Sequence, residues 1–283
     1  MRLVRYGAAG AERPGLIDSR GLLRDASAFV SDWNPAYLSS HSLARLRNLD
    51  PGTLPIVAGQ PRLGVPVAGI SKFLAIGLNY SDFAEAMGRP VPVEPVLFTK
   101  AISCLTGPED PIVLPRDSTH TDWEVELGVV IGAQARYVEE AEALGCVAGY
   151  CLLNDLSERE YQNDRGGTWD KGKGCDTFGP VGPWLVTCDE ISDPQNVDLW
   201  LEVNGTRWQD GNTRTMIFPV AKLIAYLSCF LTLEPGDLIA TGTPPGLGSA
   251  AKPPVFLKAG DSMRLGSSRL GMQAHQVRAW QRC

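Results

Sequence analysis

The amino-acid sequence predicts a β-rich α+β fold, with a small N-terminal α/β domain over residues 1–70 and a larger domain over residues 71–283. From residue 72 onward, short apolar runs alternate with glycine and proline, which is typical of strands joined by tight turns. Two stretches, 139–145 and 219–231, instead combine good helix formers with helical spacing. The chain has 283 residues, of which 44% are hydrophobic, and can therefore bury a substantial core.

The first 70 residues predict a hairpin unit followed by one helix. The runs LVRY, GLID and LLRD are separated by turns, one of them at residues 19–21. A helix is expected from His41 to about Leu49, with Ser40 as its N-cap, and the Asp-Pro-Gly sequence at 50–52 should stop it. Proline and glycine then punctuate residues 51–68, so we place the domain boundary near Ser71.

The larger domain is expected to hold many strands and few helices. The predicted strands are FLAIGL (73–78), PVLFTK (95–100), IVLP (112–115), WEVELGVVIG (123–132), VAGYCLLN (147–154), GPWLVT (182–187), LWLEVNG (199–205), DLIATGT (237–243) and PVFLKAGDSMRLG (254–266). The helices are those predicted at 139–145 and 219–231.

Composition and charge exclude several classes of function. The net charge of −6 disfavours binding to DNA, RNA or an anionic membrane, because those partners require a basic face. No run of eighteen apolar residues occurs and the first residues lack the apolar stretch of a signal peptide, so we expect a cytoplasmic protein. The seven cysteines are odd in number and form no C-x-x-C pair, which argues against a disulfide framework or a thiolate zinc site. A small molecule is the expected partner.

Two glutamates share one face of the strand predicted at 123–132. Side chains alternate along a strand, so Glu124 and Glu126 should point the same way. Two carboxylates held this close repel each other unless positive charge lies between them, and a hard divalent cation would supply it. The alternative is a solvated strand face that carries two ordinary surface glutamates.

A third acid favours the metal site. Asp155 comes directly after the apolar strand predicted at 147–154 and just before Ser157-Glu158-Arg159-Glu160, which fits a helix-capping box. The alternative is that Asp155 only caps the turn that follows. Three acids without histidine are typical of Mg²⁺, Mn²⁺ or Ca²⁺ rather than zinc.

Two polar, glycine-containing loops remain open to more than one interpretation. The loop at 169–180 carries Lys171 and Lys173 and could present a lysine to an anionic ligand, or could hold ordinary surface lysines. The stretch TGTPPGLG at 241–248 loosely resembles an anion-binding glycine loop, but it lacks the G-K-[ST] ending of a nucleotide-binding loop.

Seven motifs in order resemble the fumarylacetoacetate hydrolase superfamily, from about Phe73 to Gly271. They are GLNYSDFAEAMG (77–88), EPVLFTKAISCLTGP (94–108), DWEVELGVVIG (122–132), AGYCLLNDLSERE (148–160), KGKGCDTFGPVGPWLV (171–186), LEVNGTRWQDGNT (201–213) and LEPGDLIATGTPPGLG (233–248). The chain looks most like bacterial members that act on 2,4-diketo-3-deoxy sugar acids or acylpyruvates, whose small N-terminal domain its first 70 residues resemble.

The resemblance implies a mixed β-sandwich roll. Members of the family are usually dimeric and act on substrates with a 2-oxo acid or 1,3-dicarbonyl unit. It implies Mg²⁺ or Mn²⁺ at Glu124, Glu126 and Asp155, with Lys173 as the active-site lysine and Thr243 as a substrate-contacting threonine. Ca²⁺ is a further candidate on the chemistry of the ligands. The expected substrate contacts are Tyr80, Phe83, Gln162 and Arg165, with Gln209 and Arg214 as further candidates; the alternative for such polar residues is simple solvation.

The chain departs from the family at one motif. Hydrolytic members usually carry N-Y-x-x-H-x-x-E, whose histidine and glutamate activate water, whereas this chain has Phe83 and Ala86 at those two positions. Glu85 lies one residue early, which on a helix rotates it by roughly 100°. Asp82, Glu85 or His120 remain open as substitutes, against the alternative that each is solvated.

The predicted function is therefore a metal-dependent hydrolase that cleaves a carbon–carbon bond in a small 2,4-dioxo acid. Decarboxylation, keto–enol isomerisation, lyase chemistry on a 2-oxo acid, or ligand binding without turnover are the alternatives, because Phe83 cannot accept a proton.

Overall fold

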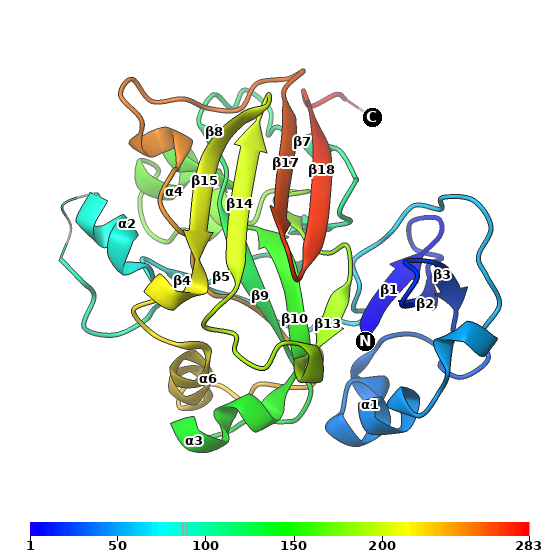
Figure 1. Ribbon diagram of the computed structural model, residues 1–283. Coiled ribbons are helices and arrows are strands. Elements are labelled where there is room, and N and C mark those ends of the chain that lie inside the picture. The colour runs from blue at the N-terminus through cyan, green and yellow to red at the C-terminus, as the bar shows by residue number, and fades with distance from the viewer. Residues whose placement is uncertain (87, 89, 283) are drawn as a thin grey trace.

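The computed structural model describes residues 1–86, 88 and 90–282, and its largest element is a nine-stranded mixed sheet (Figure 1). In spatial order the sheet holds β3 (Leu23–Asp25), β2 (Arg13–Ile17), β1 (Arg2–Tyr6), β13 (Leu185–Thr187), β10 (Val147–Asn154), β9 (Val125–Ile131), β16 (Leu238–Ala240), β4 (Phe73–Gly77) and β5 (Val96–Thr99). The antiparallel neighbours β9 and β10 are buried at every residue. Their sequences are nearly continuous apolar runs because both faces of the sheet are covered here.

A five-stranded sheet covers the middle of the larger sheet. It holds, in order, β15 (Thr206–Asn212), β14 (Asp198–Val203), β17 (Ser262–Ser267), β18 (Gly271–Arg278) and β7 (Ile112–Val113). Figure 1 shows these strands standing in front of β9 and β10, and β14 contacts β9 while β18 contacts β10. Two short pairs complete the strands: β8 (Thr121–Asp122) with β11 (Ser157–Glu158), and β6 (Leu105–Thr106) with β12 (Gly179–Pro180).

The helices are short and lie around the sheets. They are α1 (Ser40–Arg47), α2 (Ser81–Ala86), α3 (Glu140–Ala143), α4 (Arg159–Asn163), α5 (Asp170–Lys173) and α6 (Val220–Ser228). Single 3₁₀ turns occur at η1 (Pro35–Tyr37), η2 (Pro51–Thr53), η3 (Ile102–Cys104), η4 (Leu144–Cys146), η5 (Cys188–Glu190), η6 (Thr213–Thr215) and η7 (Gly248–Ala250). Within the described part of the chain, no helix is long and apolar enough to cross a membrane.

The N-terminal segment extends the larger sheet. Strand β1 pairs with β2 on one side and with β13 on the other, so β1–β3 continue the sheet of the rest of the chain. Figure 1 shows these strands and α1 grouped at one side of the molecule. One sheet contains strands from both sides of Ser71, so the sheet itself marks no boundary there. The domain boundary near Ser71 stays a prediction.

Several local predictions were wrong in detail. Ser39, not Ser40, caps α1, since its side chain accepts from Ser42 N. The capping box predicted at 157–160 is absent: Ser157 pairs in β11, and Glu158 caps α4. Residues 254–261 form no strand and β17 begins at Ser262, because Pro253 and Pro254 supply no N–H and the Asp261 carboxylate accepts from Lys258 N in a turn. The helix expected at 139–145 is one α-helical turn followed by η4.

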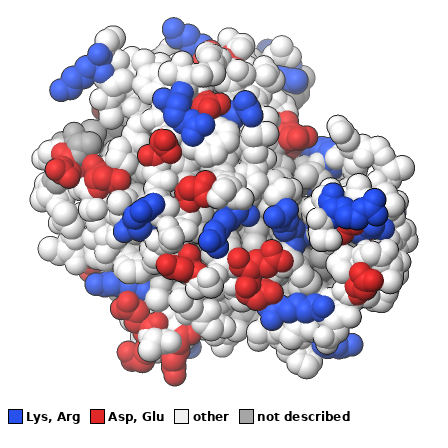
Figure 2. Space-filling view, viewed as in Figure 1, with Lys and Arg blue, Asp and Glu red and all other residues white. Residues whose placement is uncertain are grey.

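Charged side chains of both signs are interspersed on the molecular face drawn in Figure 2. The cysteines in the described part of the chain are free, namely Cys104, Cys146, Cys151, Cys175, Cys188 and Cys229. Cys104 and Cys151 are buried among apolar residues of the core.

Candidate metal centre

The central strands bring the three predicted metal ligands together. Glu124 directly precedes β9, Glu126 lies on it, and Asp155 directly follows β10, the neighbouring strand. The Asp155 amide donates to the Glu124 carbonyl at 2.8 Å, which fixes the two backbones side by side. Carboxylate oxygens of the three residues lie within 4.8 Å of one another, and the residues are only 7%, 1% and 1% exposed. Glu124 and Glu126 are therefore not on a solvated strand face.

Two buried lysines hold the two oxygens of Asp155. Lys173, the last residue of α5, donates from Nζ to Asp155 Oδ2 at 2.6 Å and to Glu124 Oε2 at 2.8 Å. Lys100, which follows β5, donates from Nζ to Asp155 Oδ1 at 2.6 Å and also to the carbonyls of Leu156 and Lys173. Sequence reasoning missed Lys100, although it lies inside the motif at 94–108.

An arginine extends these contacts on the other side of Glu124. Arg159, the first residue of α4, donates to Glu124 Oε1 at 2.6 Å and to Asp122 Oδ2 at 2.9 Å. The result is a chain of alternating charges that we call the ion-pair chain: Lys100, Asp155, Lys173, Glu124, Arg159 and Asp122. Arg159 was named in a motif but not as a site residue, and only its contacts in the fold identify it.

Glu126 lies outside the ion-pair chain and has one hydrogen bond in the described structure, from the Gly242 amide to Oε2 at 2.8 Å. Burial, followed by the nearby charges of Asp155 and Glu124, raises its pKa well above the usual value. Burial also acts to raise the pKa of Asp155, but the charges and hydrogen bonds of Lys100 and Lys173 outweigh it and hold that pKa below its usual value. Glu126 is thus the carboxylate that lacks a compensating cation.

The donor set fits a divalent cation. Three buried carboxylates with no cysteine or histidine among them match the oxygen ligands of Mg²⁺, Mn²⁺ or Ca²⁺. Burial and then repulsion by Asp155 and Glu124 raise the Glu126 pKa, and such an ion would relieve the repulsion. The residues that would hold it are Glu124, Glu126 and Asp155.

Glu124 and Glu126 of the triad line a cavity of about 130 Å³, and Asp155 lies behind them. Its lining residues are Ile76, Gly77, Leu78, Phe83, Glu124, Glu126, Arg159, Gln162, Asn163, Trp169, Lys173, Thr243, Leu247 and Ser249. Of the predicted site residues, the fold brings Lys173, Thr243, Phe83 and Gln162 to this cavity beside the two glutamates. The roles of these four residues remain predictions, but all four residues lie at the same cavity.

Thr243 is held in place by a second set of contacts. Its hydroxyl donates to the Val125 carbonyl and accepts from Gln209 Nε2, both at 2.8 Å. Gln209 is fully buried and accepts the Val125 amide at 2.8 Å, so its side chain ties the threonine to the start of β9. The Gly242 amide, one residue earlier, binds the Glu126 carboxylate, so this glycine loop does hold an anion, one that belongs to the protein itself.

Other candidates lie away from the cavity lining. Arg165 pairs with Glu160 at 2.8 Å and is exposed, and Arg214 is exposed. Tyr80 is fully buried, and no hydrogen-bond partner for its hydroxyl is found in the described structure. These placements give no support to a substrate contact from Arg165 or Tyr80, which stays a prediction.

The three residues proposed to replace the family histidine do not line the cavity. Asp82 accepts from the Thr215 hydroxyl at 3.0 Å, Glu85 is exposed, and His120 contacts Thr119 and the ring of Phe256. Phe83, in contrast, lines it and is 8% exposed. The Ala86 side chain lies outside the described residues.

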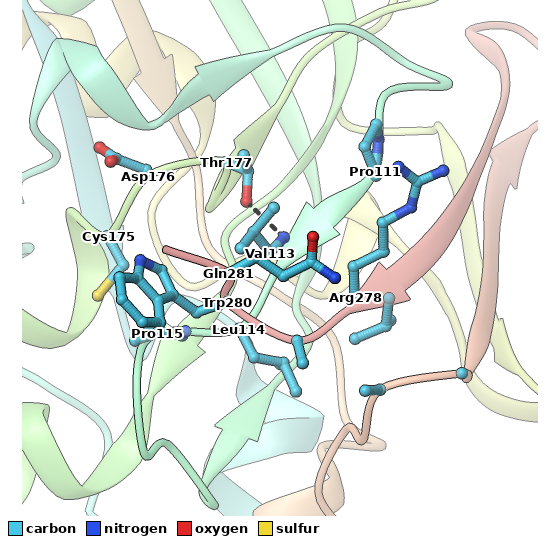
Figure 3. A pocket seen from close by; sticks show the side chains of 14 residues that line it. Pro111, Val113, Leu114, Pro115, Cys175, Asp176, Thr177, Arg278, Trp280 and Gln281 are labelled. Atoms are coloured by element: carbon cyan, nitrogen blue, oxygen red, sulfur yellow. Dashed lines mark hydrogen bonds between the residues drawn. The ribbon is translucent and has the colours of Figure 1, made fainter. Parts of the chain in front are cut away.

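A larger cleft of about 950 Å³ lies elsewhere, between β7, the end of β18 and the loop at 175–177 (Figure 3). It contains none of the triad, the lysines or Arg159, so its size does not make it the candidate active site. Another grouping, His120, Glu158 and Glu160, has its carboxylates engaged: Glu158 accepts from Ser118, Thr121 and backbone amides, and Glu160 pairs with Arg165.

Comparison with known proteins shows the family of the chain. The family profile described as fumarylacetoacetate (FAA) hydrolase C-terminal matches residues 72–278. The chain belongs to this family. A Burkholderia orbicola member named "Putative hydrolase" is 60% identical over 279 residues, which cover 98% of this chain and 99% of that protein.

Solved structures of family members show the same fold. Fumarylacetoacetate hydrolase from Exiguobacterium antarcticum is 33% identical, with a TM-score of 0.87 over 99% of this chain and 100% of that one. Maleylpyruvate hydrolase from Sphingobium sp. SYK-6, in complex with manganese(II) and pyruvate, is 31% identical, with a TM-score of 0.81 over 99% and 100% of the two chains. The predicted fold, a β-rich α+β architecture with a small N-terminal unit and mixed sheets, is confirmed.

Proposed function

We propose that this family member is a divalent-metal-dependent hydrolase that breaks a carbon–carbon bond in a small 2,4-dioxo acid. The observation that carries the proposal is the buried triad of Glu124, Glu126 and Asp155, with Lys173 donating to two of the three carboxylates at the wall of one small cavity. The relative solved with manganese and pyruvate supports Mn²⁺ or Mg²⁺ as the ion and a 2-oxo acid as the ligand.

The proposed reaction consumes one water. The water oxygen adds to C4 of the substrate, the C3–C4 bond breaks, and its electron pair passes to C3 as the enolate of pyruvate. Protonation of C3 then gives pyruvate, and the other product is the carboxylic acid derived from the acyl group. A bound divalent cation supplies chelation of the 2-oxo acid and charge stabilisation of the developing enolate.

The protein side chains orient the reactants and add positive charge. Lys173 reaches the cavity with Nζ fixed between Glu124 and Asp155, where its charge stabilises a developing oxyanion. Burial acts to lower the Lys173 pKa, but Asp155 and Glu124 outweigh it and raise that pKa, so the lysine stays a cation at neutral pH. The Thr243 hydroxyl, locked by Gln209, is a rigid polar contact for the substrate.

One observation favours a second candidate. Phe83 lines the cavity at the position of the family histidine, and no histidine belongs to the lining that the structure describes. Hydrolysis needs a base to activate water, whereas decarboxylation, isomerisation or lyase chemistry on a 2-oxo acid needs only a stabilised enolate. A binding protein without turnover needs neither.

Product analysis separates these candidates. With Mn²⁺ and 2,4-dioxopentanoate, hydrolysis releases pyruvate and acetate in equal amounts, and chelation of the metal abolishes the release. Oxaloacetate decarboxylation without acetate release would establish the second candidate and overturn the first. Lys173→Met should abolish either activity, while Lys171→Met, an exposed lysine of the same helix, should leave it unchanged. Calorimetric uptake of Mn²⁺ with no product from either acid would indicate a binding protein.

The role of position 83 has its own test. Phe83→His restores the family residue, and Phe83→Leu is the matched control that changes shape without adding a base. Faster acetate release in Phe83→His alone would mean that water activation limits the natural protein. If the natural protein already hydrolyses the substrate rapidly and Phe83→His does not improve it, another group activates the water.

The expected homodimer and cytoplasmic location belong to the same proposal. Light scattering should give twice the chain mass of 30.6 kDa. Cell fractionation should place the protein with the cytoplasmic enzymes, and recovery with membranes would overturn that expectation.

A further inference from the structure

The cavity is lined by polar residues on one part of its boundary and by apolar residues on another. The polar lining residues are Glu124, Glu126, Arg159, Gln162, Asn163, Lys173, Thr243 and Ser249. Ile76, Leu78, Phe83, Trp169 and Leu247 form an apolar wall. We call these five residues the apolar wall. They come from β4 and the residue after it, α2, the segment before α5, and the loop after β16. A substrate that fills this cavity must therefore place apolar atoms against part of its boundary.

The apolar wall is tightly fixed. A Cβ added at Gly77 would lie 2.5 Å from the Trp169 ring. That ring also packs edge-on against the Phe98 ring, with the two ring centroids 5.3 Å apart. Leu78 has φ 55°, a left-handed conformation that is rare for a bulky residue and persists only where its surroundings impose it. The wall therefore cannot easily move aside to expose polar groups to a ligand.

Every cation at the cavity is already paired. Lys173 and Arg159 line the cavity, and Lys100 lies behind Lys173, where it donates to the Lys173 carbonyl. Each of these three cations donates to at least one carboxylate of the ion-pair chain. No further lysine or arginine is among the lining residues that the structure describes. A second substrate carboxylate would lose its hydration there without gaining a free cation.

The charges allow one substrate carboxylate. The ion-pair chain has three cations and three carboxylates and is formally neutral. Glu126 adds one negative charge, and a divalent cation brings the total to +1. One substrate carboxylate makes the site neutral, whereas a second leaves a buried negative charge, which is costly.

We infer that this site takes a 2,4-dioxo acid with a single carboxylate and a short, uncharged chain beyond C4 that packs on the apolar wall, and that Phe83 is a specificity-determining residue for that choice. The inference rests on the proposed function for the 2,4-dioxo unit. The cavity of about 130 Å³ is small beside the roughly 300–1,000 Å³ of sites for larger ligands, which limits the chain to a few carbons. This selectivity would differ from the one that the name of the maleylpyruvate hydrolase indicates, since maleylpyruvate carries two carboxylates.

A pair of matched ligands tests the inference without turnover. 2-Oxoheptanoate and 2-oxoheptanedioate have the same length, differ only in the terminal carboxylate, and lack the C4 carbonyl that hydrolysis requires. Calorimetry on the Mn²⁺-loaded protein should show 2-oxoheptanoate binding at least about tenfold more tightly. Equal affinity, tighter binding of the dioate, or no binding of the monoacid would overturn the inference.

Substitution in the wall should reverse the preference. Phe83→Arg adds the missing cation and should strengthen dioate binding relative to the monoacid by about tenfold or more, while Phe83→Leu keeps the original preference. Leu247→Lys adds a cation at another point of the wall and serves if Phe83→Arg does not fold. An unchanged preference in a folded cationic variant would show that these residues do not determine it.

Turnover of two further acids distinguishes failure of the inference from failure of the proposed function. They are 2,4-dioxoheptanoate and 2,4-dioxoheptanedioate. Comparable kcat/KM values for both would support hydrolysis and overturn the inference. If neither is cleaved while 2-oxoheptanoate still binds preferentially, the ligand class holds and the hydrolase proposal fails.

Discussion

Lys100 donates from Nζ to Asp155 Oδ1 at 2.6 Å, while Lys173 holds the other oxygen of the same carboxylate. Lys100 and Asp155 are 3% and 1% exposed. A carboxylate bonded at both oxygens cannot rotate freely, and Lys100 also binds the backbone carbonyl of Lys173. Lys100 is therefore a positioning residue that fixes a proposed metal ligand and the neighbouring lysine together.

Replacing Lys100 should weaken metal binding. Lys100→Met leaves Asp155 with one lysine and leaves the Lys173 carbonyl unsatisfied, so we expect about a tenfold or greater loss of Mn²⁺ affinity and about 3 kcal/mol lower stability. Calorimetry and denaturant unfolding measure the two effects. Lys72→Met, which breaks a pair with the buried Asp237 away from the cavity, should lower stability without changing Mn²⁺ affinity. Equal loss of Mn²⁺ affinity in both variants would show that Lys100 acts only through overall stability.

Glu126 should be required for metal uptake but unfavourable for the metal-free fold. Glu126→Gln keeps an oxygen for the Gly242 amide but removes the charge whose burial, beside Asp155 and Glu124, is unfavourable. We expect Mn²⁺ affinity to fall by about a hundredfold. The melting temperature without metal should be unchanged or higher. Glu234 accepts from Gln134 Nε2 and does not line the cavity, so the control Glu234→Gln should change neither quantity. A Glu126→Gln protein that binds Mn²⁺ normally would remove this residue from the metal site.

Gly242 should be required for the geometry around Glu126. It has φ +98°, and an added Cβ would lie 2.8 Å from the Asn79 Cβ, so Gly242→Ala combines backbone strain with a clash. Gly260 has a similar φ of +96° but open space around an added Cβ, so Gly260→Ala measures the strain alone. We expect a cost of about 1 kcal/mol for Gly260→Ala and clearly more for Gly242→Ala, with weaker Mn²⁺ binding in the latter alone. Equal unfolding free energies would show that the Asn79 contact relaxes without cost.

Arg62 should contribute stability that disappears in acid. It pairs with Asp110 at 2.6 Å and Glu12 at 2.9 Å, and although burial acts to raise the pKa values of both carboxyl groups, these contacts and nearby hydrogen bonds lower them. A lowered pKa stabilises the fold above the unfolded values of about 3.9 and 4.3, and this stabilisation is lost as the pH falls through the folded values.

Arg62→Gln should therefore lower stability by about 1 kcal/mol or less at pH 7, since the arginine is partly exposed. Below about pH 4 the difference from the unmodified protein should shrink toward zero. Thermal unfolding across this range measures it, with the exposed Arg116 as a control whose replacement has no effect. A difference that persists undiminished at pH 2.5 would contradict the assignment to these ion pairs.

The acidic triad could be predicted from the sequence because its signals are local. Glu124 and Glu126 are two residues apart, so strand alternation predicts that they share a face, and Asp155 directly follows the apolar run of β10. Lys173 and Thr243 were identified by family resemblance, since a lysine in a glycine-rich loop is ambiguous by itself. Lys100 and Arg159 carried no such signal, because their roles depend on contacts with residues 55 and 35 positions away.

The β-rich architecture and the closeness of the three acids follow from the order of residues along the chain, because side-chain periodicity and strand ends are properties of neighbouring residues. The pairing of the charges, the place of Glu126 outside the ion-pair chain and the place of Phe83 in the cavity wall become visible only in the folded chain. Those features arise where β4, β5, β9, β10, α2, α4 and α5 meet, and such long-range contacts are set by packing of the whole chain.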